Sequence, residues 1–311
     1  MLRLQLHQPG KQTTVIFANP NFGELQAGKS DSRLLVTKQA NPQTTTVGFD
    51  FSRAYFSPLP GTAGEARALK RLLPQAEVLT QAQASEAALK QLHSPKVLHV
   101  ATHGFFLQNL DSITEGTRRL KHLGLAPATS SNSPTGAVNL RSDNPLLRSG
   151  LAFSGANLHK KGDDDGILTA LEASGLDLWG TKLVVLSACD TGVGEVKNGE
   201  GVYGLRRALV LAGSETQVMS LWPVSDLGTR DLMIGYYKRL LAGQGRTEAL
   251  RNTQLEMLRS GIQSGNETNR LLVTKGQTTV TNNSKKKDRS HPYYWASFIQ
   301  SGEWANLDGK R

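Results

Sequence analysis

The sequence contains one cysteine, and this cysteine follows an apolar run that is typical of a buried strand. Cys189 directly follows the run Leu183–Ala188, and His103 directly follows a second such run, Val97–Thr102. Because the carboxyl ends of parallel strands meet at one edge of a sheet, neighbouring strands would bring the imidazole to the thiol. A thiol of pKa about 8.5 is only a few per cent ionised at neutral pH, so a base beside it would activate it as a nucleophile. The pattern predicts a Cys–His dyad, and the alternative is an inert buried cysteine with an unrelated histidine.

The elements expected before the cysteine run alternate between strands and helices. Thr62 and Glu65 have the spacing of a capping box, so we expect a helix to begin beside them. Such alternation is typical of an α/β fold, here a doubly wound, mostly parallel sheet of about six strands flanked by helices. The expected elements, in order, are strand Thr14–Ala18, a helix from about Ala63, strand Val78–Leu79, helix Glu86–Leu92 and strand Val97–Thr102.

The pattern continues beyond the cysteine run with helices whose apolar residues recur at helical spacing. The closing element is expected to be a strand, because it is rich in aromatic and β-branched residues. These elements are helix Val202–Ala212, strand Val218–Trp222, a helix that follows Pro223–Asp226 and runs through Leu240, helix Thr247–Arg259 and strand Tyr293–Gln300.

We expect a single domain over residues 1–311, interrupted by three polar segments. Residues 1–55 combine the first strand with a polar loop, residues 106–166 form a long loop near the active site, and residues 260–290 form a polar insertion. Asp163–Asp165, in the second segment, suggest a cation site. Successive side chains point in different directions, however, so we expect neither a metal ion nor another cofactor.

Composition limits the partners and the compartment. The 36 Lys and Arg against 26 Asp and Glu give a net charge of +10, which raises the possibility of nucleic-acid binding. The basic residues are scattered and their tightest cluster, Lys285–Lys287, lies in a polar stretch, so direct nucleic-acid binding is not expected. No apolar run approaches the roughly 20 residues that span a bilayer. A lone cysteine permits no intramolecular disulfide and favours a reducing cytoplasm.

Six short motifs occur in the order expected of the CHAT family, which this sequence therefore resembles. Members of that family are caspase-like, clan CD cysteine peptidase domains related to separases. The resemblance extends from about Phe56 to Trp304. Six motifs in a fixed order are more specific than the histidine or the cysteine motif alone. The motifs are His99–Gly104, Leu186–Gly192, Gly199–Gly201, Ala212–Gly213, Ser220–Asp226 and His291–Ala296.

The resemblance implies a cysteine endopeptidase that cuts a specific protein partner in a regulated signalling or defence pathway. Cys189 would be the nucleophile, and His103 would take its proton and return it to the leaving amine. Backbone N–H groups of Gly104 and Cys189 would form the oxyanion hole, as they do in caspase-like enzymes. Because relatives often carry tetratricopeptide repeats, a protein with such repeats or a sensor is an expected activator. The alternative from another class is a catalytically silent interaction module.

Specificity is expected to depend on a carboxylate near the dyad. Trp222–Asp226 resembles a separase segment whose acidic residue helps to bind a basic side chain before the scissile bond, so we expect Asp226 and Trp222 to contact substrate. Asp226 would then pair with Arg or Lys. Asp226 could equally cap the following helix, and Asp190 is the competing pocket carboxylate. His99, four residues before His103, should share its strand face, and we interpret it as a buried structural histidine.

Overall fold

The computed structural model describes residues 12–23, 55–106, 145–160, 162, 164–188, 195–197, 201–222, 225–267 and 289–309. Within these ranges, only the backbone is described for residues 12, 145, 195–197, 201–203 and 260–267.

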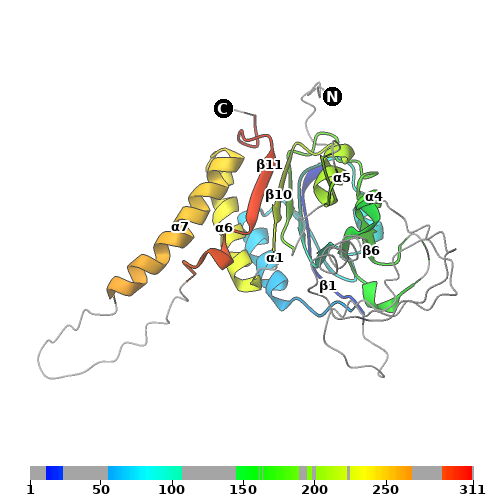
Figure 1. Ribbon diagram of the computed structural model, residues 1–311, viewed down its shortest axis with the longest axis horizontal. Coiled ribbons are helices and arrows are strands. Elements are labelled where there is room, and N and C mark those ends of the chain that lie inside the picture. The colour runs from blue at the N-terminus through cyan, green and yellow to red at the C-terminus, as the bar shows by residue number, and fades with distance from the viewer. Residues whose placement is uncertain are drawn as a thin grey trace, which may run out of the picture.

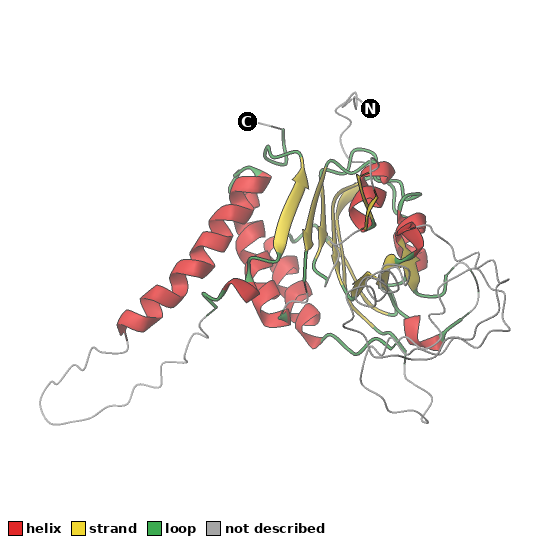
Figure 2. Cartoon of the chain, viewed as in Figure 1, coloured by secondary structure: helices red, strands yellow, loops and turns green. Residues whose placement is uncertain are grey.

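A six-stranded sheet lies at the centre of the molecule, and five of its strands run parallel (Figures 1 and 2). The edge strand β11 pairs antiparallel to β10. The mostly parallel α/β sheet of about six strands is therefore confirmed. The strands, in sheet order, are β11 (Phe298–Gly302), β10 (Thr216–Ser220), β7 (Leu183–Leu186), β3 (Pro95–Ala101), β1 (Gln12–Pro20) and β2 (Glu77–Gln81).

Helices cover both faces of this sheet, as Figure 1 shows with α1, α6 and α7 on one side and α4 and α5 on the other. Alternate residues of each central strand pack toward the two helical layers, so the sheet separates two apolar clusters. All four residues of β7 are buried, which explains why its sequence is an unbroken apolar run. The helices are α1 (Pro60–Leu72), α2 (Glu86–Lys90), α4 (Ala170–Ala173), α5 (Leu205–Ala212), α6 (Asp226–Leu241) and α7 (Arg246–Glu267).

The start of α1 differs from the predicted capping box. The helix begins at Pro60, whose fixed φ and missing N–H suit a first helical turn, and Thr62 lies inside it. The Thr62 hydroxyl donates to the carbonyl of Leu59 at 2.7 Å, and the Glu65 carboxylate accepts from the hydroxyl of Ser187, which follows β7. A capping box does occur elsewhere, between Thr169 and Glu172 at the start of α4.

Part of the segment that the sequence predicts as a long loop is regular structure. β4 (Gly104–Phe106), β5 (Ser149–Ala152) and β6 (Ile167–Thr169) form a second, antiparallel sheet. Two short 3₁₀ helices, Pro145–Leu147 and Ala156–Leu158, flank β5. Strands of three or four residues carry too little periodicity to be recognised in a polar sequence, so the pattern missed them. Residues 107–144 of the predicted loop lie outside the described residues.

The C-terminal elements are also displaced from their expected bounds. α7 continues to Glu267, so the first residues of the predicted polar insertion are helical, and residues 268–288 lie outside the described residues. Pro292–Tyr294 form a 3₁₀ helix, and the closing strand β11 begins only at Phe298. β8 (Glu195–Lys197) and β9 (Gly201–Tyr203) form a separate hairpin. None of the helices in the described part of the chain combines the length and apolarity that a bilayer crossing requires.

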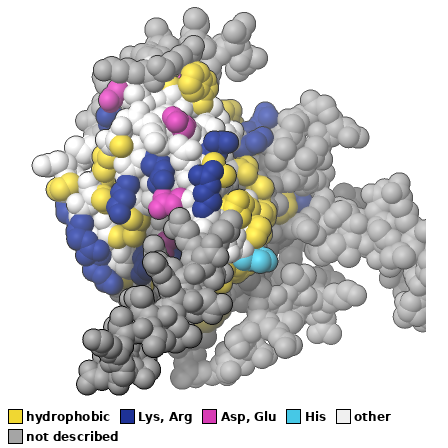
Figure 3. All heavy atoms as spheres, turned by 90° about the vertical axis from the view of Figure 1, so that its left-hand side faces the viewer, with side chains coloured by type: hydrophobic (Ala, Val, Ile, Leu, Met, Phe, Trp, Pro, Cys, Tyr) yellow, Lys and Arg dark blue, Asp and Glu magenta, His cyan; other side chains and the backbone are white. Residues whose placement is uncertain are grey.

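On the one face that Figure 3 shows, the described basic side chains do not gather into one platform. Figure 3, which views the face on the left of Figure 1, shows Lys and Arg spread among acidic, polar and apolar side chains. Several basic side chains are held by local carboxylates, including Arg239, which binds Glu256 at 2.7 Å, and Arg289, which binds Asp231. This distribution gives no support to a nucleic-acid interface on that face.

Candidate active site

The strands that lead to the predicted dyad are direct neighbours. β3 and β7 run parallel, with His99 opposite Val185 and Val100 opposite Leu186. The Ser187 N–H donates to the Val100 carbonyl at 2.9 Å, which extends the pairing beyond the end of β7. His103, which follows β3, therefore lies at the edge of the sheet where the chain leaves β7. Cys189 and Asp190, the next residues after Ala188, lie outside the described residues.

A backbone carbonyl sets the protonation of the His103 ring. Nε2 of His103 lies 2.8 Å from the carbonyl oxygen of Ser57. A carbonyl oxygen only accepts hydrogen bonds, so Nε2 carries the proton in this contact and Nδ1 of the neutral ring is the acceptor. The role of Ser57 was not predictable from the sequence, because any residue at that position would supply the same oxygen.

Aromatic side chains surround the His103 ring. The ring centroid lies 5.2 Å from that of Phe22 and 5.7 Å from that of Phe56, and Phe56 in turn lies 6.4 Å from Phe105. Desolvation by these neighbours lowers the pKa of His103, while the Ser57 carbonyl and the Asp226 charge act in the opposite direction. The imidazole is consequently favoured in its neutral form at pH 7, the form that can accept a proton.

Gly104 begins β4, and its ladder position determines where its amide points. The Ala152 N–H donates to the His103 carbonyl at 2.9 Å, while Gly104 lies opposite Leu151. Hydrogen-bonded and non-hydrogen-bonded pairs alternate along an antiparallel ladder, so the Gly104 N–H is directed away from β5. The Thr102 hydroxyl donates to the Ala152 carbonyl and so further stabilises the connection between β3 and β4. The amide predicted for the oxyanion hole is thus not used by the second sheet.

Asp226 is the first residue of α6 and lies at the same edge of the sheet as His103. It is half-buried, and its charge is one of the groups that act on the pKa of His103. The first turn of α1 packs directly on it, because a Cβ built on Gly61 would lie 2.3 Å from the Asp226 Cβ. Ser225 is the N-cap residue of α6, and its side chain makes no capping bond. Asp226 is the acidic residue of the first turn, where its negative charge interacts favourably with the helix N-terminus.

Trp222 leaves β10, the strand beside β7. Its side chain is half-buried, and two residues earlier the Ser220 hydroxyl donates to the carbonyl of Ala188. This bond connects the strand end that leads to Trp222 with the residue that precedes Cys189. The structure thus brings His103, Gly104, Asp226 and Trp222 to one edge, with Asp190 outside the described residues.

One residue of the predicted acidic run, Asp164, contributes to a group of carboxylates around Lys90. The Lys90 ammonium lies 2.7 Å from Glu86, 3.1 Å from Glu172 and 3.6 Å from Asp164. Burial alone would lower the pKa of Lys90, but its bonds to Glu86 and Glu172 outweigh that effect and raise it. No cluster of three or more metal-ligating side chains occurs among the described residues. Asp163 lies outside them.

His99 is fully buried, as expected, but it does not share a strand face with His103. β3 ends at Ala101, so the period-two argument does not extend to His103. The His99 ring instead faces α1 and α6, with Nε2 3.0 Å from Glu65 and Nδ1 3.1 Å from the Tyr237 hydroxyl. The two histidines are therefore separate features of the molecule.

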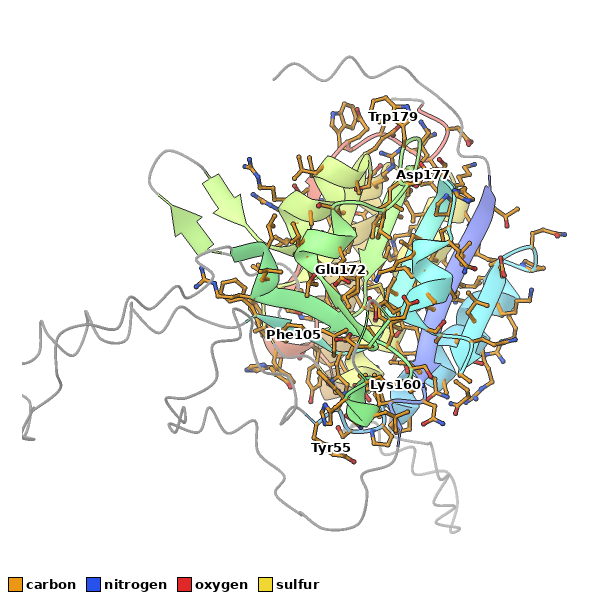
Figure 4. The ribbon with its side chains drawn as sticks, turned by 90° about the vertical axis from the view of Figure 1, so that its right-hand side faces the viewer. Tyr55, Phe105, Lys160, Glu172, Asp177 and Trp179 are labelled. Atoms are coloured by element: carbon orange, nitrogen blue, oxygen red, sulfur yellow. The ribbon has the colours of Figure 1, made fainter. Side chains whose placement is uncertain are left out.

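Figure 4 shows how the labelled side chains are distributed along the sheet. Tyr55 and Lys160 lie toward one end, and Asp177 and Trp179 lie at the opposite end. Tyr55 precedes the segment that supplies the Ser57 carbonyl, so the candidate site lies at the first of these ends, where β3 and β7 finish.

Comparison with known proteins identifies one family over nearly the whole chain. A family model described as CHAT domain matches residues 3–303. Tetratricopeptide repeat protein 28 of Homo sapiens is 24% identical over 284 residues, an alignment that covers 90% of this chain and 10% of that protein. Tetratricopeptide repeat protein 28 of Mus musculus is 25% identical over 220 residues, covering 69% of this chain and 8% of that protein. The chain thus spans about a tenth of the length of these curated relatives.

Proposed function

Because the chain belongs to the CHAT-domain family, we propose that it is a caspase-like cysteine endopeptidase that cleaves a specific protein partner through Cys189 and His103. The observation that carries the proposal is the bond from His103 Nε2 to the Ser57 carbonyl. This bond selects the tautomer whose Nδ1 can accept a thiol proton. The lowered pKa of His103 keeps that acceptor available at neutral pH.

The proposed reaction begins when the Cys189 thiol transfers its proton to Nδ1 of His103. The thiolate sulfur attacks the peptide carbonyl carbon, and the negative charge that develops on the oxygen is stabilised by the N–H groups of Gly104 and Cys189. The imidazolium then gives its proton to the leaving amine as the carbon–nitrogen bond breaks. Water hydrolyses the acyl-enzyme and restores the thiol. The Asp226 charge favours the transient imidazolium.

We further propose that the residue before the cut is Arg or Lys, with Asp226 as its partner and Trp222 beside it. Half-burial of Asp226 supports this role, because a carboxylate that is partly removed from water pairs more strongly with a cation. Asp190 is the second candidate for that position. Asp226 also acts on His103, so one carboxylate would serve both substrate binding and catalysis.

The setting of the activity is part of the same proposal. The relatives that match this chain are named as tetratricopeptide repeat proteins, which supports a partner or activator that carries such repeats. The lone cysteine supports a reducing cytoplasm, and a regulated signalling or defence pathway suits a peptidase directed at one partner.

The direct test is cleavage of a peptide library by the wild-type protein and by Cys189→Ala and His103→Ala. We expect Cys189→Ala to abolish cleavage and His103→Ala to lower it by about 10²–10⁴-fold, with the double variant no worse than the nucleophile variant. His93→Ala is the matched control, because His93 is an exposed histidine near Asp177 at the opposite end of β3. A cysteine-directed acyloxymethyl ketone should label the single thiol of the wild type. Undiminished cleavage by Cys189→Ala would reject Cys189 as the nucleophile, and a wild-type protein that cleaves nothing and is not labelled would favour the silent interaction module.

A further inference from the structure

A buried network of polar side chains lies between the sheet and helices α1 and α6, below the candidate site. The Glu65 carboxylate accepts from the Ser187 hydroxyl at 3.0 Å through Oε2, and its Oε1 lies 3.0 Å from Nε2 of His99. Nδ1 of His99 lies 3.1 Å from the Tyr237 hydroxyl. The four residues are between 0% and 5% exposed, so the network is closed to solvent. The peptidase mechanism uses none of these side chains.

Each member of the network belongs to a different element, and each element leads to a group of the candidate site. Glu65 lies on α1, which follows the Ser57 carbonyl directly, and His99 lies on β3, which leads to His103. Ser187 follows β7 and precedes Cys189 by two positions in the sequence, and Tyr237 lies on α6, whose first residue is Asp226.

Burial of a carboxylate at the position of Glu65 is energetically unfavourable. Glu65 lies next to Ala66 and one helical turn before Leu69, both members of the apolar cluster on that side of the sheet, where removal of a charge from water costs free energy that an apolar side chain would not. Strand pairing does not require it, because β3 and β7 already exchange backbone hydrogen bonds. A buried ionisable group of this kind is best explained by the arrangement that it specifies.

We propose that Glu65 is a positioning residue, which holds α1, β3, β7 and α6 together so that the groups they carry meet at the active site. The inference rests on the proposed function, because it assigns the network to the geometry of that dyad.

The protons of the network can be placed consistently. Burial, together with the nearby Tyr236 and Glu65, holds the pKa of Tyr237 well above its ordinary value of 10, so its hydroxyl keeps its proton. Tyr237 can donate to Nδ1 of His99, and the Ser187 hydroxyl donates to Oε2 of Glu65. Nε2 of His99 lies 3.0 Å from Oε1 of Glu65, a close contact that does not have hydrogen-bond geometry. Replacement of Glu65 by Gln keeps the shape but exchanges one acceptor for a donor. One of the two contacts must then weaken or reverse.

The test measures the dyad in two independent ways in Glu65→Gln. One is the split between kcat and KM for cleavage, and the other is the pH dependence of Cys189 alkylation by iodoacetamide, which needs no peptidase activity. We expect kcat to fall about 10- to 100-fold with KM nearly unchanged, because displacements on the order of 1 Å reach such losses. Alkylation at pH 7 should slow about tenfold, because a displaced His103 no longer takes the thiol proton efficiently.

Glu86→Gln is the matched control. Glu86 is also 1% exposed and accepts from the Gly166 N–H at 2.9 Å, but it belongs to the Lys90 cluster away from the dyad. We expect this variant to keep wild-type kcat and alkylation. If Glu65→Gln fails to fold, Ser187→Ala replaces it, because that change removes one hydroxyl and breaks only the link to the β7 end.

Wild-type kcat and alkylation in a folded Glu65→Gln or Ser187→Ala protein would overturn the positioning role. Equal losses in Glu86→Gln would also overturn it, because they would reflect lost stability alone. A wild-type protein that cleaves nothing would reject the peptidase function separately. In that case slower alkylation in Glu65→Gln, but not in Glu86→Gln, would still support the positioning role.

Discussion

Replacement of Asp226 by Asn separates the two roles that the structure allows for this residue. The substitution removes the negative charge but keeps the volume, so the close packing of the α1 start on this side chain at Gly61 is preserved. Asp226 is the first helical residue of α6 and interacts with the helix N-terminus through its charge, so its replacement by Asn should cost only about 0.3–1 kcal/mol of stability. Any larger effect on activity must come from the charge.

The expected magnitude follows from the exposure of Asp226. Loss of one partner of a desolvated charge pair costs about 2–5 kcal/mol, most of it the penalty of the charge left unpaired. Asp226 is half-buried, so the lower part of that range applies. A loss of about 2–3 kcal/mol corresponds to about a 30- to 150-fold lower kcat/KM for substrates with Arg or Lys before the cut. Substrates with Leu or Met there should lose less than about threefold.

The same variant should change the pH dependence. The Asp226 charge raises the pKa of His103, which burial lowers, so its removal lowers that pKa further. The acid limb of the kcat/KM profile, below which the imidazole is protonated and cannot accept the thiol proton, should therefore move to lower pH for every substrate. Kinetics with paired basic and apolar peptides over a range of pH measure both effects.

Asp231→Asn is the matched control, because it makes the same change on the same helix at a carboxylate bound by Arg230 and Arg289. We expect it to leave specificity and the acid limb unchanged. Equal losses for basic and apolar substrates would reject Asp226 as the specificity residue and make Asp190 the next candidate. An unmoved acid limb would show that Asp226 does not act on His103.

Two further predictions concern the packing that supports this edge. Gly61→Ala should destabilise the fold and impair cleavage, because its Cβ would lie 2.3 Å from the Cβ of Asp226, whereas Gly64→Ala, whose nearest contact would be 3.5 Å, should stabilise the same helix by about 0.5–1 kcal/mol. Thermal unfolding of the pair measures the difference, and equal shifts would contradict the close approach of α1 and α6. Arg246→Met should lower the free energy of unfolding by about 3 kcal/mol, the low end for a broken buried pair, because Glu215 keeps a second cation partner. Urea titration measures it, and a loss below about 1 kcal/mol would show that the buried guanidinium is dispensable.

The sheet was predictable from the sequence because its central strands are buried on both faces. Leu183–Leu186 and Val97–Thr102 are apolar runs that few other structures would accommodate, and their parallel pairing follows from the helices between strands. The short strands of the second sheet and the true start of α1 were missed. In β5 the four residues Ser149–Ala152 are buried by tertiary contacts that their own pattern does not indicate.

The sequence by itself determined the α/β class, the neighbouring strands and the residue types of the candidate dyad, because hydrophobic periodicity and side-chain type are local properties of the chain. Only the tertiary structure decided that a backbone carbonyl orients His103, that Asp226 acts on the same ring, and that Glu65 meets His99 and Ser187. These contacts join residues up to 123 positions apart, from Asp226 back to His103, and they form because the sheet brings its strand ends to one edge. No pattern of neighbouring residues encodes such distances, so they depend on how the layers pack.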